Sequence, residues 1–106
     1  MPKRRLFYSH LSQRDLDDIF DYIANELENQ LAASETIAAI LDRAEELELF
    51  PFIGSIVEGL PFASDEYRFL GVKNYLIFYR VTETEIFIDR ILYAKREYHK
   101  IGRAHV

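Results

Sequence analysis

The amino-acid sequence predicts a small α+β domain with an N-terminal strand, an antiparallel helix hairpin, and then a three-stranded antiparallel meander packed on the helices. Two patterns support this fold class. Apolar residues recur at helical spacing through the first half of the chain, and runs of β-branched and aromatic residues, separated by short turns, follow from residue 66. With 106 residues, of which 49% are hydrophobic, the chain can form one domain with its own core.

A short strand and a long helix open the chain. Residues 5–9 predict the strand, and Ser12 followed by Asp15 gives the spacing in which a serine hydroxyl caps a helix. Asp15 then falls in the first turn, where the helix dipole favours negative charge. The helix is expected to end near Glu28. Its apolar face comprises Leu16, Ile19, Phe20, Ile23, Ala24 and Leu27.

A second helix is expected from about Leu31 to Glu48, with Pro51 ending it because the residue before a proline avoids the α region. Only a few residues join the two helices, so they should form an antiparallel hairpin. Its outer faces are acidic. We interpret these acids as a solvated surface rather than a metal site or a pair of catalytic carboxylates, because no histidine or second acid accompanies them on the apolar side.

The last part of the chain is expected to be β-structure. Residues 51–65 are interpreted as a loop, and strands are expected at 66–70, 75–81 and 85–93, with a turn at 71–74. The central strand is apolar on both faces. Because the helix hairpin can cover only one face of a small sheet, the C-terminal segment or another chain should cover the other.

Composition excludes several classes of protein. There is no cysteine, which excludes disulfide scaffolds, zinc sites of the cysteine type and thiol catalysis. No apolar run approaches the roughly 18 residues of a membrane span, so we expect a cytoplasmic protein. We also expect neither a cofactor nor a bound metal. Charge is uneven: residues 12–66 hold 14 acidic and two basic residues, whereas residues 67–106 hold eight basic and four acidic residues. The basic C-terminal third is therefore the best candidate for contact with a target.

The order of elements resembles that of the RelE/ParE superfamily of bacterial type II toxins, and the ParE-like branch in particular. The resemblance is carried by residues 15–23, the strand segment 67–70, and the segments 74–81 and 88–97. It implies a growth-inhibiting toxin that is encoded beside an antitoxin and bound by it in a hetero-oligomer. No membrane partner is implied.

The resemblance leaves three functions open. A ParE-like chain inhibits DNA gyrase without being an enzyme, a RelE-like chain cleaves mRNA in the ribosome, and a third possibility is a non-toxic interaction domain of the same fold. Of the RelE-like basic positions, Arg68 and Arg96 match, whereas Leu70 and Leu76 depart from the pattern. The distal tyrosine of that pattern falls near Gly102, where this chain has none. Tyr98 and His99 are nearby residues that can move a proton. We therefore favour gyrase inhibition.

The resemblance and the charge pattern together give a set of candidate site residues. If the chain is an interferase, the catalytic residues are Arg68, Arg96, Tyr98 and His99. Contact with the target is expected at Lys95, Arg96 and Lys100, and contact with the antitoxin at Tyr75, Tyr79, Arg80 and Arg90. The alternative for the strand arginines is cross-strand pairing with neighbouring acids, and for the tyrosines a place in the core or at its rim.

The last residues do not resemble the family. Residues 102–106 read like the translation of a common sequencing adapter. We therefore expect one toxin domain at residues 1–101 and a non-native tail at 102–106.

Overall fold

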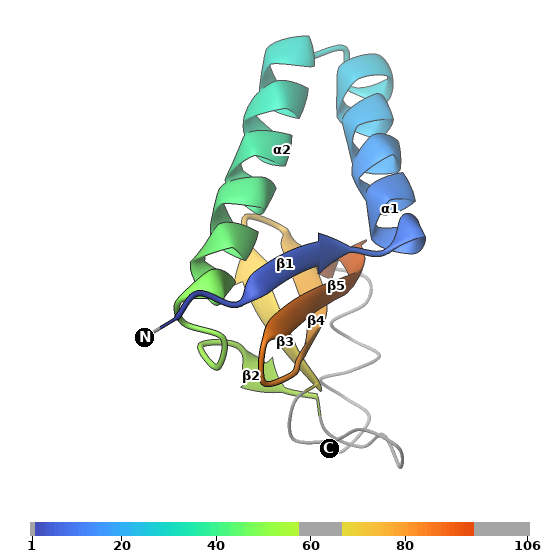
Figure 1. Ribbon diagram of the computed structural model, residues 1–106. Helices are drawn as coiled ribbons and strands as arrows, with labels where there is room; N and C mark the ends of the chain where they lie inside the picture. The colour runs from blue at the N-terminus through green and yellow to red at the C-terminus, as the bar shows by residue number, and fades with distance from the viewer. Residues whose placement is uncertain (1, 58–66, 95–106) are drawn as a thin grey trace.

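The computed structural model describes residues 2–57 and 67–94, and Figure 1 shows their arrangement. The candidate domain boundary near residue 101 lies outside these residues. Along the chain, the helical elements and strands are β1 (Arg5–Tyr8), α1 (His10–Asp21), η1 (Tyr22–Glu26), α2 (Gln30–Glu45), η2 (Glu46–Glu48), β2 (Ser55–Ile56), β3 (Tyr67–Val72), β4 (Tyr75–Val81) and β5 (Glu85–Tyr93).

The strands form one sheet in the order β1-β5-β4-β3-β2. The predicted α+β architecture is confirmed, and β3, β4 and β5 form the expected antiparallel meander. Two strands extend it. β1 pairs in parallel with β5, with Leu6 opposite Ile86, and β2 pairs antiparallel with β3. The interpretation of residues 51–65 as a loop is wrong at β2, which is only two residues long and therefore has no period to recognise.

The start of α1 differs from the prediction. The capping residue is Ser9, whose hydroxyl oxygen accepts a hydrogen bond from the backbone N–H of Ser12 at 3.0 Å. Ser12 is fully buried inside the helix, and its own hydroxyl donates to the carbonyl oxygen of Ser9 at 2.8 Å. The prediction of Ser12 as the capping residue was wrong, because a second serine, Ser9, lies three residues before it and offers the same hydroxyl group. Ser9 makes the cap since β1 ends one residue before it.

The end of the first helix is irregular. The α-helix gives way at Tyr22 to a π-helical turn, and Glu28 then adopts a left-handed backbone conformation with φ of 51°. Asn29 caps α2, its side-chain oxygen accepting from the backbone N–H of Ala32 at 2.9 Å. The predicted helix end near Glu28 and the hairpin are both present. π-Helical turns change the direction of a helix and often occur at functional sites.

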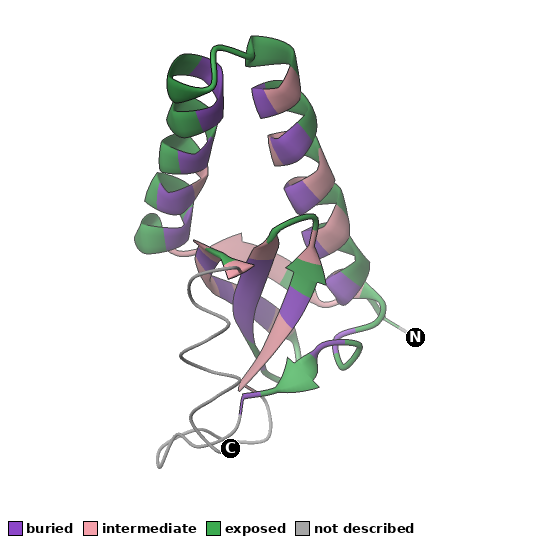
Figure 2. Ribbon diagram, turned by 180° about the vertical axis from the view of Figure 1, so that it is seen from behind, coloured by how far each residue is buried: buried purple, intermediate pink, exposed green. Residues whose placement is uncertain are grey.

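The main core lies between the helices and one face of the sheet. Figure 2 shows that the buried residues of α1 and α2 face inward while their outer surfaces are exposed. The residues of β4 alternate as expected, with Ile77, Tyr79 and Val81 in the core under the helices. Two members of the predicted apolar face of α1, Phe20 and Leu27, are instead exposed.

The opposite face of the sheet holds a smaller apolar cluster. Leu76 and Phe78 of β4 are buried there with Val57. Partly buried neighbours of this cluster include Phe69 and Leu92. The central strand is therefore apolar on both faces, as predicted. The C-terminal segment proposed to cover the second face lies outside the described residues. Among the helices that are described, none is long and apolar enough to span a membrane.

Candidate functional site

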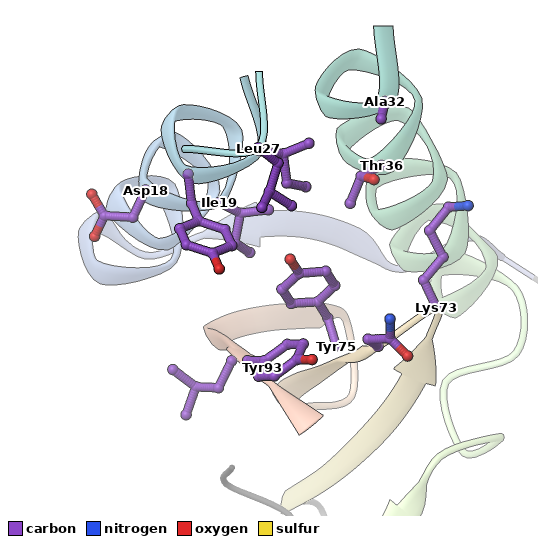
Figure 3. A pocket seen from close by; sticks show the side chains of 12 residues that line it. Asp18, Ile19, Leu27, Ala32, Thr36, Lys73, Tyr75 and Tyr93 are labelled. Atoms are coloured by element: carbon purple, nitrogen blue, oxygen red, sulfur yellow. The ribbon is translucent and has the colours of Figure 1, made fainter. Parts of the chain in front are cut away.

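A cleft of about 690 Å³ opens between the two helices and the end of the sheet. Figure 3 shows it from close by, with side chains entering from α1 and η1, from α2, from the turn between β3 and β4, and from the ends of β4 and β5. The lining residues are Asp18, Ile19, Tyr22, Ile23, Leu27, Ala32, Thr36, Lys73, Asn74, Tyr75, Leu92 and Tyr93. Clefts of this size with apolar walls and a few polar groups are typical binding sites.

Two helical rows form the walls of the cleft. One row runs along α1 and η1 to the residue just after η1, and its members at four-residue spacing are Ile19, Ile23 and Leu27. The other row lies on α2 and consists, at the same spacing, of Ala32 and Thr36. Residues at this spacing lie on one side of a helix. The side chain of Leu27 is 56% exposed, so the apolar surface of the cleft is accessible.

Three tyrosines surround the middle of the cleft. Tyr75 and Tyr93, which are paired across β4 and β5, meet edge to face with ring centroids 5.6 Å apart. Tyr22 on η1 and Tyr93 are 55% and 42% exposed. Burial raises the pKa of Tyr75, and the nearby Tyr93 and Tyr22 raise it further. Tyr75 is therefore neutral at physiological pH. The three rings offer large rigid surfaces of the kind that makes tyrosine common in protein interfaces.

Two charged residues lie at the edges of the cleft. Asp18 is on α1, and Lys73 is in the tight turn between β3 and β4, where it adopts a left-handed conformation with φ of 52°. Both are exposed. Within residues 2–57 and 67–94, neither forms an ion pair.

Tyr79 has a different environment from the cleft tyrosines. It has no exposed surface, and its hydroxyl donates to the carbonyl oxygen of Pro51 at 2.8 Å and accepts from the backbone N–H of Gly54 at 3.0 Å. Burial raises the pKa of Tyr79, an effect that the hydrogen bond from Gly54 partly opposes. Tyr79, predicted as an antitoxin contact, is therefore enclosed in this structure, and its side chain holds the loop after α2.

Arg68 also binds that loop. Its Nη1 donates to the carbonyl oxygen of Gly54 at 2.8 Å and to that of Phe52 at 3.4 Å. The guanidinium carbon lies 5.0 Å from the centre of the Phe52 ring. These contacts give Arg68 a structural role, and they differ from the cross-strand ion pair that was the alternative for this residue.

The two other strand arginines form ion pairs. Arg80 bonds Asp89 across β4 and β5, with Nε 2.9 Å from Oδ2, as the cross-strand alternative predicted. It lies over Phe87 on the face of the sheet away from the cleft. Arg90 instead reaches α1 and binds both carboxylate oxygens of Asp15, at 2.8 and 3.0 Å. The candidate antitoxin residues are therefore not gathered in one place, and only Tyr75 lines the cleft.

The predicted place of Asp15 in the first turn is wrong, because α1 begins at His10, and Asp15 is a buried anchor. Besides Arg90, it accepts the backbone N–H of Ile91 at 2.9 Å. β1 ends opposite Ile88, so Asp15 provides a partner for β5 just beyond the end of the parallel pairing. This contact fixes α1 against β5 and so positions one wall of the cleft.

The remaining candidate residues, Lys95, Arg96, Tyr98, His99 and Lys100, lie outside the described residues. Sequence reasoning missed Asp18, Tyr22, Leu27 and Lys73 as site residues. A signal did exist for Tyr22, which follows Ile19 by three positions and so shares the apolar face of its helix. No group of three His, Asp or Glu residues in the described parts of the chain could hold a metal ion.

Comparison with known proteins gives the family. The model of the ParE toxin of the parDE type II toxin–antitoxin system matches residues 6–98. This chain belongs to the ParE toxin family. No curated protein is similar enough in sequence to count as a relative.

Solved structures share the fold of this ParE family member. A chain from the chromosomal ParDE toxin–antitoxin system of P. aeruginosa is 24% identical with a TM-score of 0.69, and the match covers 86% of this chain and 96% of that one. A chain of the E. coli DinJ–YafQ toxin–antitoxin complex is 14% identical with a TM-score of 0.53, covering 88% and 94%. At these identities the two matches show the fold alone.

Proposed function

We propose that this toxin arrests bacterial growth by ParE-like inhibition of DNA gyrase, without acting as an enzyme, and that a cognate antitoxin neutralises it in a hetero-oligomeric complex. The observation that carries the proposal is the family match over residues 6–98, which includes the helix hairpin and the whole meander. The solved proteins of the same fold come from toxin–antitoxin systems, which supports an antitoxin as the partner.

The environment of Arg68 favours gyrase inhibition over cleavage of mRNA. Phosphoryl transfer to a 2′-hydroxyl needs basic groups that are free to approach the reacting phosphate. Of the two RelE-like basic residues matched in the sequence, Arg68 is bound to the carbonyl oxygens of Phe52 and Gly54. Leu70 and Leu76, which replace two other basic residues of the RelE-like pattern, are buried.

For the gyrase contact we propose Lys95, Arg96 and Lys100, which lie in the basic C-terminal third of the chain. For the antitoxin we propose the cleft around Tyr75. An apolar cleft with three tyrosines at its centre has the composition of an interface core, where aromatic residues contribute most of the binding energy.

The test is to induce the toxin in a bacterium that lacks the antitoxin and to pulse-label DNA and protein synthesis in the same culture. We expect DNA synthesis to stop first and gyrase–DNA complexes to accumulate. The triple variant Lys95→Ala, Arg96→Ala, Lys100→Ala should lose this arrest, whereas Arg14→Ala, which removes an exposed base from α1, should keep it.

Two results would contradict the proposal. If protein synthesis stops first and Arg96→Ala abolishes RNA cleavage, the chain is a ribosome-dependent mRNA interferase. If both syntheses continue while the antitoxin still binds, the chain is a non-toxic interaction domain.

A further inference from the structure

We propose that the loop after α2 carries a contact surface for the folded target of this toxin, and that this surface binds an apolar part of the target that bears acidic residues. This inference rests on the proposed function, since it adds a second contact to the same target, gyrase. The surface, called here the loop patch, comprises Leu49, Phe50, Phe52, Ile53 and Ile56.

Exposed apolar residues gather on this loop. Within residues 2–57 and 67–94, eleven large apolar or aromatic side chains are exposed, and five of them form the loop patch within eight consecutive positions. Phe50 is 59% exposed and Phe52 is 52% exposed. Apolar side chains scattered singly over a surface are ordinary, whereas a group of this kind marks a contact with another molecule.

The backbone that carries these side chains is anchored to the sheet. The hydroxyl of Tyr79 accepts a hydrogen bond from the backbone N–H of Gly54, and Nη1 of Arg68 donates to the carbonyl oxygens of Phe52 and Gly54. Ile56 pairs with Arg68 across β2 and β3, so its side chain lies on the same face of the sheet. A surface that is ordered before it binds loses little conformational entropy on binding.

Two arginines give the loop patch a positive charge. The guanidinium carbons of Arg4 and Arg68 lie 5.6 and 5.0 Å from the centre of the Phe52 ring. Both side chains donate to backbone carbonyl oxygens, and neither forms an ion pair within the described parts of the chain. The buried Nε of Arg68 also has no hydrogen-bond acceptor there. Carboxylates of a partner would balance these charges, so an apolar surface with acidic residues fits the patch.

The position of the loop patch favours the folded target over the antitoxin. None of its five residues lines the cleft. Along β4, the cleft lies at Tyr75 and the loop lies against Tyr79, and Figure 1 shows β2 at the end of the molecule away from the tip of the helix hairpin. Side chains that stand out from a loop are accessible to a large folded protein, whereas the floor of a cleft between two helices is not.

The composition of the loop patch favours a protein over a nucleic acid. Exposed aromatic rings beside arginines are also a surface on which the bases of single-stranded DNA stack. However, Leu49, Ile53 and Ile56 are aliphatic and offer no ring for stacking. Together with the two phenylalanines and the arginines, they have the composition of the core of a protein interface.

The experiment measures the concentration of purified toxin that halves DNA supercoiling by purified gyrase. The affinity of the same toxin for its cognate antitoxin is measured separately by calorimetry. Two variants alter the loop patch and its charge, Phe50→Ala and Arg4→Glu. The matched controls are Leu11→Ala and Arg14→Glu, which make the corresponding changes at exposed residues of α1 that do not line the cleft.

We expect Phe50→Ala and Arg4→Glu each to raise the inhibitory concentration about tenfold, and each control to change it by less than about twofold. The affinity for the antitoxin should stay within about twofold in all four variants, because none of the changed residues lines the cleft. Since Phe50 is mostly exposed, its truncation should shift the unfolding temperature by no more than about 3 °C, which separates a lost contact from a lost fold.

Three results would overturn the inference. If the affinity for the antitoxin falls together with inhibition, the loop patch belongs to the antitoxin. If both patch variants inhibit gyrase like their controls, the target does not use this loop. If only one of the two weakens inhibition, the target surface is not both apolar and acidic, and the stated chemistry is wrong.

Two further results are distinguished by their own readouts. Binding of the toxin to fluorescent single-stranded DNA without gyrase, lost in Arg4→Glu but kept in Arg14→Glu, would make the loop patch a nucleic-acid surface and overturn the protein partner. If the unaltered toxin does not inhibit purified gyrase, the proposed function itself is overturned.

Discussion

Tyr75 and Tyr79 lie four residues apart on the same face of β4, yet they lie in two different kinds of environment. Tyr79 is fully buried, and its hydroxyl is bonded to Pro51 and Gly54 of the loop after α2. Tyr75 is partly buried, meets Tyr93 edge to face and lines the open cleft. One half of this sheet face is therefore closed by a loop, and the other half is left open between the helices.

The difference shows that burial on this strand is decided by what packs over it, and not by the strand itself. The closing loop can approach only because residue 54 is glycine, since a Cβ there would stand 2.5 Å from the Tyr79 hydroxyl. Among residues 2–57 and 67–94, no such segment covers Tyr75. The closed half should contribute mostly to stability and the open half mostly to binding.

The largest expected effect comes from truncating each tyrosine. Tyr79→Ala should lower the free energy of unfolding by about 3–5 kcal/mol, because it leaves a cavity in the closed half. Tyr75→Ala should cost only about 1–2 kcal/mol, because its ring is partly exposed already. Urea denaturation of the two variants measures the difference. Equal losses would mean that the cleft is closed in solution.

A smaller effect is expected from replacing two glycines, Gly54 in the loop after α2 and Gly71 in β3. Gly54→Ala should destabilise the protein by about 1–3 kcal/mol, because the added methyl would also stand 2.6 Å from the carbonyl oxygen of Phe69. Gly71→Ala is the matched control. The nearest neighbour of the added methyl is an atom of Leu76 at 4.0 Å, so we expect the free energy of unfolding to rise by about 0.5 kcal/mol. Thermal unfolding of both variants tests the pair. A neutral Gly54→Ala would show that the loop does not lie against Tyr79.

The same comparison explains what the sequence could predict. β4 and β5 match the predicted strands because each is a long apolar run bounded by turn residues. Such local patterns report which residues face a core. They do not report contacts between distant segments, and the parallel pairing of β1 with β5 joins residues about 80 positions apart. The role of Asp15 as an anchor could not be predicted for this reason, since its partners Arg90 and Ile91 come from the other end of the chain.

The candidate site was harder to predict than the fold. Tyr75 could be named from its strand, but whether a tyrosine is covered depends on the loop after α2, which has little regular structure. The π-helical turn that begins at Tyr22 lines part of the cleft, and that irregularity has no marker in the pattern of apolar residues. Asp18 and Lys73 line the same cleft only because of this arrangement.

Alkaline pH should destabilise the fold by a smaller amount through Tyr8. Burial raises the pKa of Tyr8 on β1 to about 12, and the carboxylates of Glu45 and Glu48 contribute in the same direction. The unfolded chain releases this proton near pH 10, whereas the folded chain holds it, so stability is complete below pH 10 and is lost as pH rises toward 12. Since Tyr8 is only partly buried, we expect a loss of about 1 kcal/mol.

The measurement is the unfolding temperature at intervals between pH 8 and pH 11.5. In the Tyr8→Phe variant, the unfolding temperature should fall less steeply above pH 10, because the variant has no proton to release at that position. If Tyr8→Phe and the wild type decline together, the alkaline loss comes from other groups, and Tyr8 is solvated despite its position beside the core.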